Sequence, residues 1–94
     1  MWHVYILECN NKIYYVGMTD NIKRRVNQHI NKQSFYTKQF FNIRLVYVEQ
    51  YKYRKEAEKR EAQLKKWSVA KKKALIIGDI DRLKKLSNGS EFIE

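Results

Sequence analysis

The sequence contains no proline, three glycines and one cysteine among 94 residues. So few chain breakers argue against linkers and low-complexity segments. The single Cys9 can form neither an internal disulfide nor a cysteine-built zinc site, which favours a reducing compartment. No stretch approaches the ~20 apolar residues of a membrane span, and the first ten residues do not resemble a signal peptide. We therefore expect a cytoplasmic protein that does not enter a membrane.

What the chain does have is positive charge and aromatic side chains. Twenty Lys and Arg residues against ten Asp and Glu residues give a net charge of +10, and residues 52–73 alone hold ten basic and three acidic residues. Apolar residues make up 44% of the chain, which is enough for one modest core. A field of this sign attracts polyanions, so nucleic acid is the expected partner. RNA- and ribosome-associated proteins carry similar charge, and that alternative stays open.

Runs rich in β-branched and aromatic residues predict three β-strands, over 3–9, 12–17 and 43–51. Asn10 and Asn11 separate the first two runs. Asparagine tolerates the left-handed backbone conformation that a two-residue type I′ turn requires, so these strands should form an antiparallel hairpin. We expect Gly17 to end the second strand.

Apolar periodicity and capping residues predict helices after the hairpin and after the third strand. The first helix should have Thr19 or Asp20 as its N-cap and run through Asn31. The others should cover 54–67, 69–77 with Ser68 as N-cap and Gly78 as terminator, and 79–87. The order ββαβαα, followed by the short last helix, is typical of an α+β fold with a three-stranded antiparallel sheet flanked by helices.

The first helix carries two side chains suited to binding an anion. Ile22, Val26 and Ile30 form one apolar stripe, and Arg25 and His29, four residues apart, share a face that flanks it. Side chains at such a boundary can be partly desolvated and still reach a ligand. The alternative is an ordinary solvated basic helix.

A carboxylate interrupts the apolar face of the second helix. Glu61 lies between Ala57 and Leu64 at positions that should face inward. A buried carboxylate needs a partner, because an unpaired buried charge is costly. That partner is either Lys65, four residues on, or a divalent cation, since Mg²⁺ can be held by one carboxylate and several waters.

Two tyrosines of the predicted hairpin are also candidates for a functional site. Strand alternation allows Tyr5 and Tyr15 to share one face of the sheet, whereas Tyr14 faces the other side and the core. Two hydroxyl groups beside a helix with Arg25 and His29 would form a polar cluster. Tyrosines at the edge of a core are the plainer interpretation.

The segment after the first helix interleaves basic and aromatic residues. Phe40 and Phe41 are expected to pack on the core, although aromatics among lysines can also stack on unpaired bases. Tyr36 and Lys38 would remain accessible to a substrate. Cys9 and Trp67 are interpreted as core, and residues 71–73 as a solvated lysine face.

Taken together, these residues resemble the GIY-YIG nuclease domain, most closely its small stand-alone bacterial branch. The resemblance rests on "HVY" at 3–5, "YVG" at 15–17, the helix with Arg25, and Glu61 in the following helix. His3-Val4 and Val16 depart from the name-giving motif. The resemblance implies a GIY-YIG-like catalytic domain over 1–80, with 81–94 as a short C-terminal helix and tail of the same domain.

The resemblance also implies an activity, namely metal-dependent hydrolysis of nucleic-acid phosphodiesters, DNA more than RNA. Glu61 would hold a single Mg²⁺ or Mn²⁺ and Arg25 would bind the scissile phosphate. Tyr5 would orient or deprotonate the attacking water, with His29 as the other candidate base. Tyr15 would position the phosphate.

Further residues are candidates for contact with nucleic acid. Gly17 would let the backbone turn tightly into the helix beside the substrate. The remaining candidates are basic or aromatic: Arg24, Tyr36, Lys38, Lys65 and Lys66. A partner protein could supply specificity, because the chain has no room for a second DNA-binding domain. A catalytically weak nucleic-acid-binding module is the alternative function.

Overall fold

The computed structural model describes residues 1–32 and 37–86, apart from the side chain of Lys38. It confirms the α+β fold with a three-stranded antiparallel sheet flanked by helices. The elements are β1 Trp2–Cys9, β2 Ile13–Thr19, α1 Ile22–Ile30, the 3-10 helix η1 Thr37–Gln39, β3 Ile43–Tyr51, α2 Arg54–Lys65, α3 Val69–Ile77 and α4 Ile80–Leu86. Within the described part of the chain, no helix has the length and apolarity to cross a membrane.

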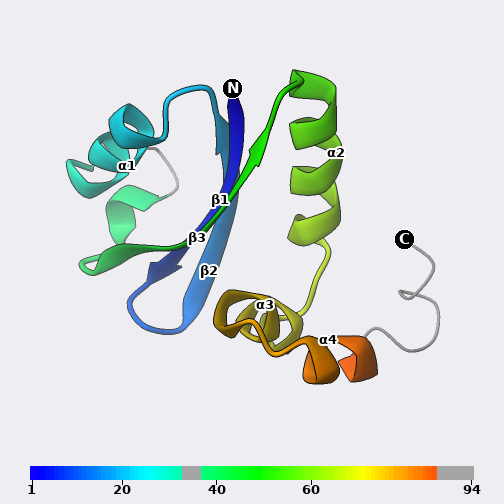
Figure 1. Cartoon of the computed structure of the whole chain (residues 1–94). Coiled ribbons are helices and arrows are strands. Elements are labelled where there is room, and N and C mark those ends of the chain that lie inside the picture. The colour runs from blue at the N-terminus through cyan, green and yellow to red at the C-terminus, as the bar shows by residue number, and fades with distance from the viewer. Residues whose placement is uncertain (33–36, 87–94) are drawn as a thin grey trace.

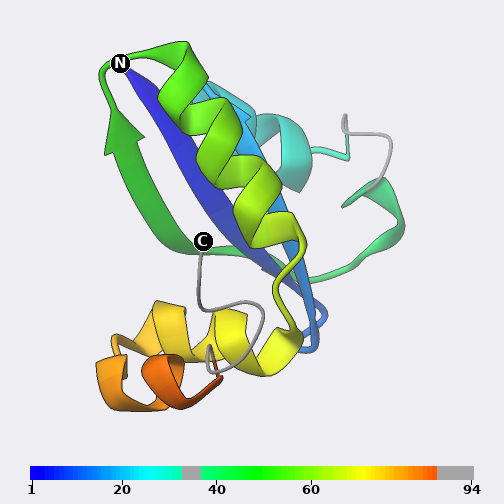
Figure 2. The same cartoon turned by 90° about the vertical axis from the view of Figure 1, so that its right-hand side faces the viewer.

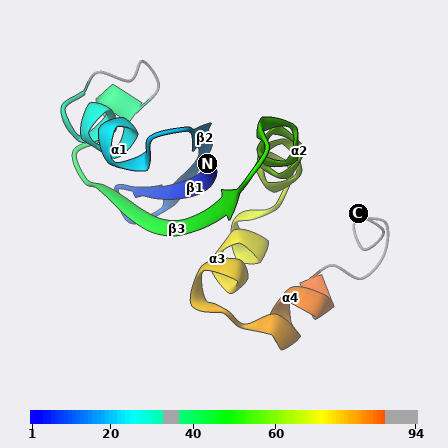
Figure 3. The same ribbon diagram turned by 45° about the horizontal axis from the view of Figure 1, so that its top comes forward.

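The sheet is covered differently on its two faces. Its strand order is β2-β1-β3, so β1 is central and both neighbours are edges. Helix α1 lies on one side and α2 on the other (Figures 1 and 3). Figure 2 shows α2 running across the sheet, with α3 and α4 beyond its C-terminal end. The central strand is therefore buried on both faces.

The β1–β2 turn sets which residues share a face. Asn10 and Asn11 adopt the predicted positive φ angles of 52° and 62°, and the Lys12 N–H donates to the Cys9 carbonyl at 3.2 Å. Cys9 pairs with Ile13, however, so Lys12 is an extra residue and the connection is one residue longer than predicted. Because a one-residue slip exchanges the two faces of a strand, this insertion decides the pairing along the whole hairpin.

The resulting register places Tyr5 opposite Gly17 and Leu7 opposite Tyr15. Tyr5 and Tyr15 therefore lie on the same face, as predicted. This face packs with Cys9 and Phe40 under α1. The opposite face, which includes Val4, Ile6 and Val16, packs against Ala57 and Leu64 of α2 and against Trp67. The catalytic candidates of β1 and β2 thus belong to the α1 side.

Helix ends follow the predicted chemistry with one exception. Ser68 accepts a hydrogen bond from the Lys71 N–H as N-cap of α3, and Gly78 ends that helix at φ 74°. The N-cap of α1 is Asn21, whose side chain accepts from the Arg24 N–H, rather than Thr19 or Asp20. Gly17 does not end β2, which continues in the ladder through Thr19.

Two expectations about packing were wrong. Lys71 was expected on a solvated face, but it is 1% exposed and its Nζ lies 4.2 Å from the centre of the Trp67 ring. A lysine packs there because a cation is attracted to the face of an indole ring. Phe40 is buried as expected, whereas Phe41 is 91% exposed. Cys9 and Trp67 are core residues, as predicted.

A partly buried carboxylate on β3 anchors α2 to the sheet. Arg60 donates to both carboxylate oxygens of Glu49, from Nε at 2.9 Å and from Nη2 at 3.0 Å. Tyr47 and Tyr51 also donate to this carboxylate. Burial raises the pKa of Glu49, but these hydrogen bonds outweigh it and hold the pKa below its ordinary value. The charged form is therefore the stable one in the folded protein.

Replacing Glu49 by glutamine should lower the free energy of unfolding by about 2–3 kcal/mol, because a partly buried Arg60 loses its counter-charge. Urea denaturation at pH 7 measures this. The difference should shrink in acid, because a carboxylate with a lowered pKa stabilises the fold above its unfolded pKa and ceases to do so as pH falls through its folded pKa. The control, Glu58→Gln, breaks an exposed pair with Arg54 and should change stability by less than about 0.5 kcal/mol. Equal losses of stability in both variants would contradict the role of Glu49 as the counter-charge of Arg60.

Candidate active site

Three of the predicted side chains meet at one hydroxyl group, and the ring of a fourth, Tyr15, packs beside them. The Tyr5 Oη lies 2.9 Å from His29 Nε2, and Arg25 Nε donates to it at 3.3 Å. The Tyr15 ring centre lies 5.2 Å from that of His29 and 6.4 Å from that of Tyr5. The strands β1 and β2 supply the tyrosines and α1 supplies the other two. The structure thus brings together residues that are up to 24 positions apart in the chain.

Helix α1 is rotated relative to the predicted orientation. His29, expected at the core boundary, is completely buried, whereas Ile30 of the expected apolar stripe is 50% exposed. A buried imidazole is tolerated because both of its nitrogens have partners, the Tyr5 hydroxyl and the Thr37 hydroxyl. Arg25, on the same side of the helix, is only partly buried and remains accessible to a ligand.

Gly17 is needed for a different reason than the predicted tight turn. It lies inside β2, directly opposite Tyr5, and its φ angle is not in the left-handed region. A Cβ atom added to Gly17 would lie 2.4 Å from the Tyr5 Oη and 2.5 Å from its Cζ. The Tyr5 side chain therefore crosses over Gly17 toward the edge of the sheet formed by β2. The Tyr5 hydroxyl occupies the space in which a side chain at position 17 would otherwise lie.

The electrostatics of the cluster keep Tyr5 and His29 uncharged at neutral pH. Burial, only partly offset by the Arg25 hydrogen bond, raises the pKa of Tyr5 to about 12. Burial and then the charge of Arg25 lower the pKa of His29 to about 4. Hydrogen bonding to Tyr5 raises the pKa of Arg25, with Tyr15 contributing in the same direction. The site consequently carries one permanent positive charge, next to a neutral phenol and a neutral imidazole.

Glu61 reaches this region from the other side of the sheet. Its side chain is 21% exposed, and Lys65 lies within 3.5 Å of its carboxylate, as the plainer prediction had it. The negative charge of Glu61 also contributes to the raised pKa of Tyr5, so the two groups are close enough to interact. No other described acid, histidine or cysteine completes a group of three around it. A partly exposed single carboxylate suits Mg²⁺ or Mn²⁺, which keep most of their waters, rather than a zinc centre.

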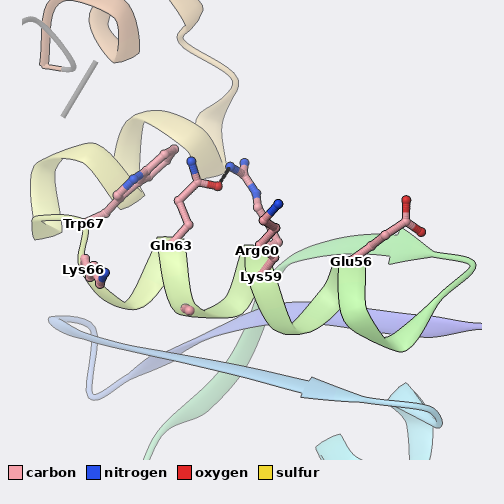
Figure 4. Close-up of a pocket in the computed structure, with 7 residues that line it drawn as sticks. Glu56, Lys59, Arg60, Gln63, Lys66 and Trp67 are labelled. Carbon is pink, nitrogen blue, oxygen red and sulfur yellow. Dashed lines mark hydrogen bonds between the residues drawn. The ribbon is translucent and has the colours of Figure 1, made fainter. Parts of the chain in front are cut away.

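The other predicted contacts are not part of the cluster. Arg24 is exposed and pairs with Asp20 at 3.2 Å. Lys66 is exposed and lines a pocket of about 920 Å³ on α2, together with Trp67 and Lys59 (Figure 4). That pocket contains none of the clustered residues and lies on the helix that covers the opposite face of the sheet. Tyr36 and the side chain of Lys38 lie outside the described part of the structure.

Two contacts of the site were not predicted. Thr37 of η1 is completely buried, and its Oγ1 lies 2.6 Å from His29 Nδ1. Gln28 accepts a hydrogen bond from Arg25 Nη1 at 3.1 Å. The position of Gln28, three residues after Arg25 on a helix, could have indicated this pair. Nothing in the local hydropathy pattern around Thr37 predicts that its hydroxyl is buried against His29.

Comparison with known proteins gives matches that cover most of the chain. Residues 1–74 match the family model of the GIY-YIG catalytic domain. The UPF0213 protein DP2720 of Desulfotalea psychrophila is 39% identical over 77 residues, which are 80% of this chain and 70% of that protein. A UPF0213 protein of Syntrophus aciditrophicus is 40% identical over 83 residues, or 86% and 95% of the two chains. The solution NMR structure of the UPF0213 protein BH0048 from Bacillus halodurans is 32% identical, with a TM-score of 0.54 over 95% of this chain and all of that one.

Proposed function

Because this chain belongs to the GIY-YIG catalytic domain family, a family of nuclease type, we propose that it is a metal-dependent endonuclease. Its substrate would be a nucleic-acid phosphodiester, DNA more than RNA. The observation that carries this proposal is the contact of Arg25 with the Tyr5 hydroxyl beside His29. A protein that only bound nucleic acid would gain nothing from two uncharged acid–base groups buried behind its arginine.

Arg25 and Tyr15 are the members of the cluster that a substrate can touch, since Tyr5 and His29 are completely buried. The planar guanidinium group can donate two hydrogen bonds to one phosphate and stabilise the charge that develops on its oxygens. Tyr15 positions the same phosphate. A phosphate on the Nη atoms of Arg25 leaves its Nε on the Tyr5 oxygen, and a small shift of the arginine toward that phosphate would let a water molecule reach the hydroxyl.

Tyr5 then acts on the attacking water. A phenol with a raised pKa is protonated at neutral pH, so it can take a proton from water only if it passes its own proton on. His29 Nε2, 2.9 Å away, is within reach to accept it. Water gives a proton to the Tyr5 oxygen, the Tyr5 proton moves to His29, and the resulting hydroxide attacks phosphorus. His29 is therefore the final proton acceptor and does not itself contact water.

Glu61 is the residue that would hold the Mg²⁺ or Mn²⁺ ion, and the bound ion would supply charge stabilisation for the leaving oxygen. Lys65, now beside the carboxylate, would turn to the nucleic-acid backbone. Lys66 and Arg24 would contribute charge along the path of the backbone. Such contacts make binding weaken as the salt concentration rises.

The test is cleavage of labelled linear, nicked, flapped and branched DNA, with RNA counterparts, in Mg²⁺, Mn²⁺ or EDTA. We expect metal-dependent cutting of at least one DNA shape. Binding without cutting in every metal would overturn the endonuclease proposal in favour of a binding module. Cutting of RNA alone would overturn the preference for DNA.

Replacing Gly17 by alanine should lower kcat about 10²-fold, because the new Cβ displaces the Tyr5 hydroxyl. A misplacement of a catalytic group by about 1 Å can reduce the rate by this factor. Single-turnover cleavage measures the loss. The control is Gly78→Ala, which strains the positive φ at the end of α3 and should lower Tm while leaving kcat unchanged. A Gly17→Ala protein with wild-type kcat would contradict the placement of Tyr5 in the reaction.

A further inference from the structure

We propose that Thr37 is a positioning residue that holds His29 in the tautomer with the proton on Nδ1, and so keeps Nε2 ready to take the proton of Tyr5. The inference rests on the proposed function for its catalytic part. The location of the proton on His29 Nδ1 does not depend on that function, because it follows from hydrogen-bond contacts alone. These contacts join three elements, β1, α1 and η1.

The tautomer follows from which groups can donate. Arg25 has no acceptor atom, so its Nε can only donate to the Tyr5 oxygen. The Tyr5 O–H must then point elsewhere, and His29 Nε2 at 2.9 Å is the partner that can accept it. A neutral imidazole that accepts at Nε2 carries its hydrogen on Nδ1. That hydrogen donates to Thr37 Oγ1 at 2.6 Å.

Burial strengthens the preference for this arrangement of hydrogen bonds. The side chains of Tyr5, His29 and Thr37 are all at 0% exposure, so bulk water cannot replace a missing partner. The opposite tautomer would place N–H groups of both Arg25 and His29 on the Tyr5 oxygen and direct the phenol hydrogen away from its acceptor. With the phenol hydrogen on Nε2, the Thr37 oxygen accepts from Nδ1–H and so stabilises the tautomer in which proton transfer from Tyr5 can proceed.

Thr37 also stabilises the product of that transfer. When the Tyr5 proton moves to Nε2, the O–H bond breaks, an N–H bond forms and the imidazole becomes an imidazolium. Its Nδ1–H stays on Thr37 Oγ1, and this hydrogen bond strengthens because its donor is now charged. The proton returns to solvent after the reaction, so no other reactant is required.

The experiment is ¹⁵N NMR of the two imidazole nitrogens of His29 at pH 7 in the wild-type protein, Thr37→Val and Thr37→Ser. The chain has only two histidines, so a His29→Gln sample assigns the signals. We expect Nδ1 to be protonated in the wild type and in Thr37→Ser. In Thr37→Val, which keeps the shape and removes the acceptor, the Nε2–H tautomer should become populated.

Cleavage kinetics of the same proteins test the catalytic part. Thr37→Val should lower kcat about 10- to 100-fold with little change in KM, as loss of a group that orients a functional imidazole does. Thr37→Ser should restore it. A wild-type imidazole protonated at Nε2 would overturn the proposal even if the variants failed to fold. Unchanged tautomer and kcat in Thr37→Val would overturn it too, whereas a protein that cleaves nothing but shows the expected Nδ1–H signal would refute the nuclease function alone.

Discussion

Replacing Glu61 by glutamine should abolish cleavage while nucleic-acid binding stays the same or becomes tighter. The substitution keeps the size of the side chain but removes the charge that attracts a divalent cation. We expect kcat to fall by at least about 10³-fold, because charge stabilisation by a metal ion is among the largest single contributions to phosphoryl chemistry. Binding should not suffer, because a negative charge near an anionic ligand has been removed.

Cleavage assays and fluorescence anisotropy in Mg²⁺ separate the two effects. Glu58→Gln is the matched control, since it removes the same charge from the same helix at an exposed position paired with Arg54. This control should cleave at the wild-type rate. Equal loss in both variants would indicate a general effect of charge on α2, and wild-type cleavage by Glu61→Gln would contradict the site.

A second readout shows whether the loss is due to the metal. Mn²⁺ titration followed by paramagnetic broadening of NMR signals should affect residues near Glu61 in the wild-type protein and not in Glu61→Gln. Broadening that persists in the variant would place the cation elsewhere. This measurement needs no nucleic acid, so it tests the metal site independently of cleavage.

The sequence was sufficient to predict most elements of the fold, because local chemistry determines them. Asn10 and Asn11 do adopt positive φ angles, and Ser68 and Gly78 do bound α3. Alternation along the strands limits which residues can share a face, but the placement of Tyr5 and Tyr15 on one face also required the extra residue in the β1–β2 turn.

Features that depend on how elements pack were not predictable in the same way. The rotation of α1 that buries His29 follows from hydrogen bonds to two residues on other elements, Tyr5 and Thr37. The role of Gly17 depends on the cross-strand pairing with Tyr5, which the extra residue Lys12 determines. No pattern within a single helix or strand contains this information.

The environment of Glu61 was predictable from the sequence only in part. Its place between Ala57 and Leu64 indicated a carboxylate that is partly buried, and Lys65 is its partner in the structure. Its electrostatic effect on Tyr5 depends on how α2 packs against the sheet. Such an encounter across the sheet is a property of the tertiary structure.

Replacing Arg25 by alanine should impair cleavage and binding together, in contrast to Glu61→Gln. Arginine residues that stabilise phosphoryl transition states contribute about 10³- to 10⁵-fold to kcat, so we expect a loss in that range. The dissociation constant should rise as well. The plot of the logarithm of the binding constant against the logarithm of the salt concentration should become less steep by about one, because one phosphate contact is lost. Arg82→Ala, at an exposed position of α4, controls for the general loss of one positive charge.

Arg25→Lys distinguishes charge from geometry at this position. Lysine keeps the positive charge but has no planar pair of donors, and it cannot donate to Tyr5 and to a phosphate in the same arrangement. We expect nearly wild-type binding and salt dependence, with cleavage still reduced to within about tenfold of the alanine variant. If Arg25→Lys cleaved as fast as the wild type, Arg25 would be only an electrostatic contact. The hydrogen bond from its Nε to the Tyr5 hydroxyl would then have no part in the chemistry.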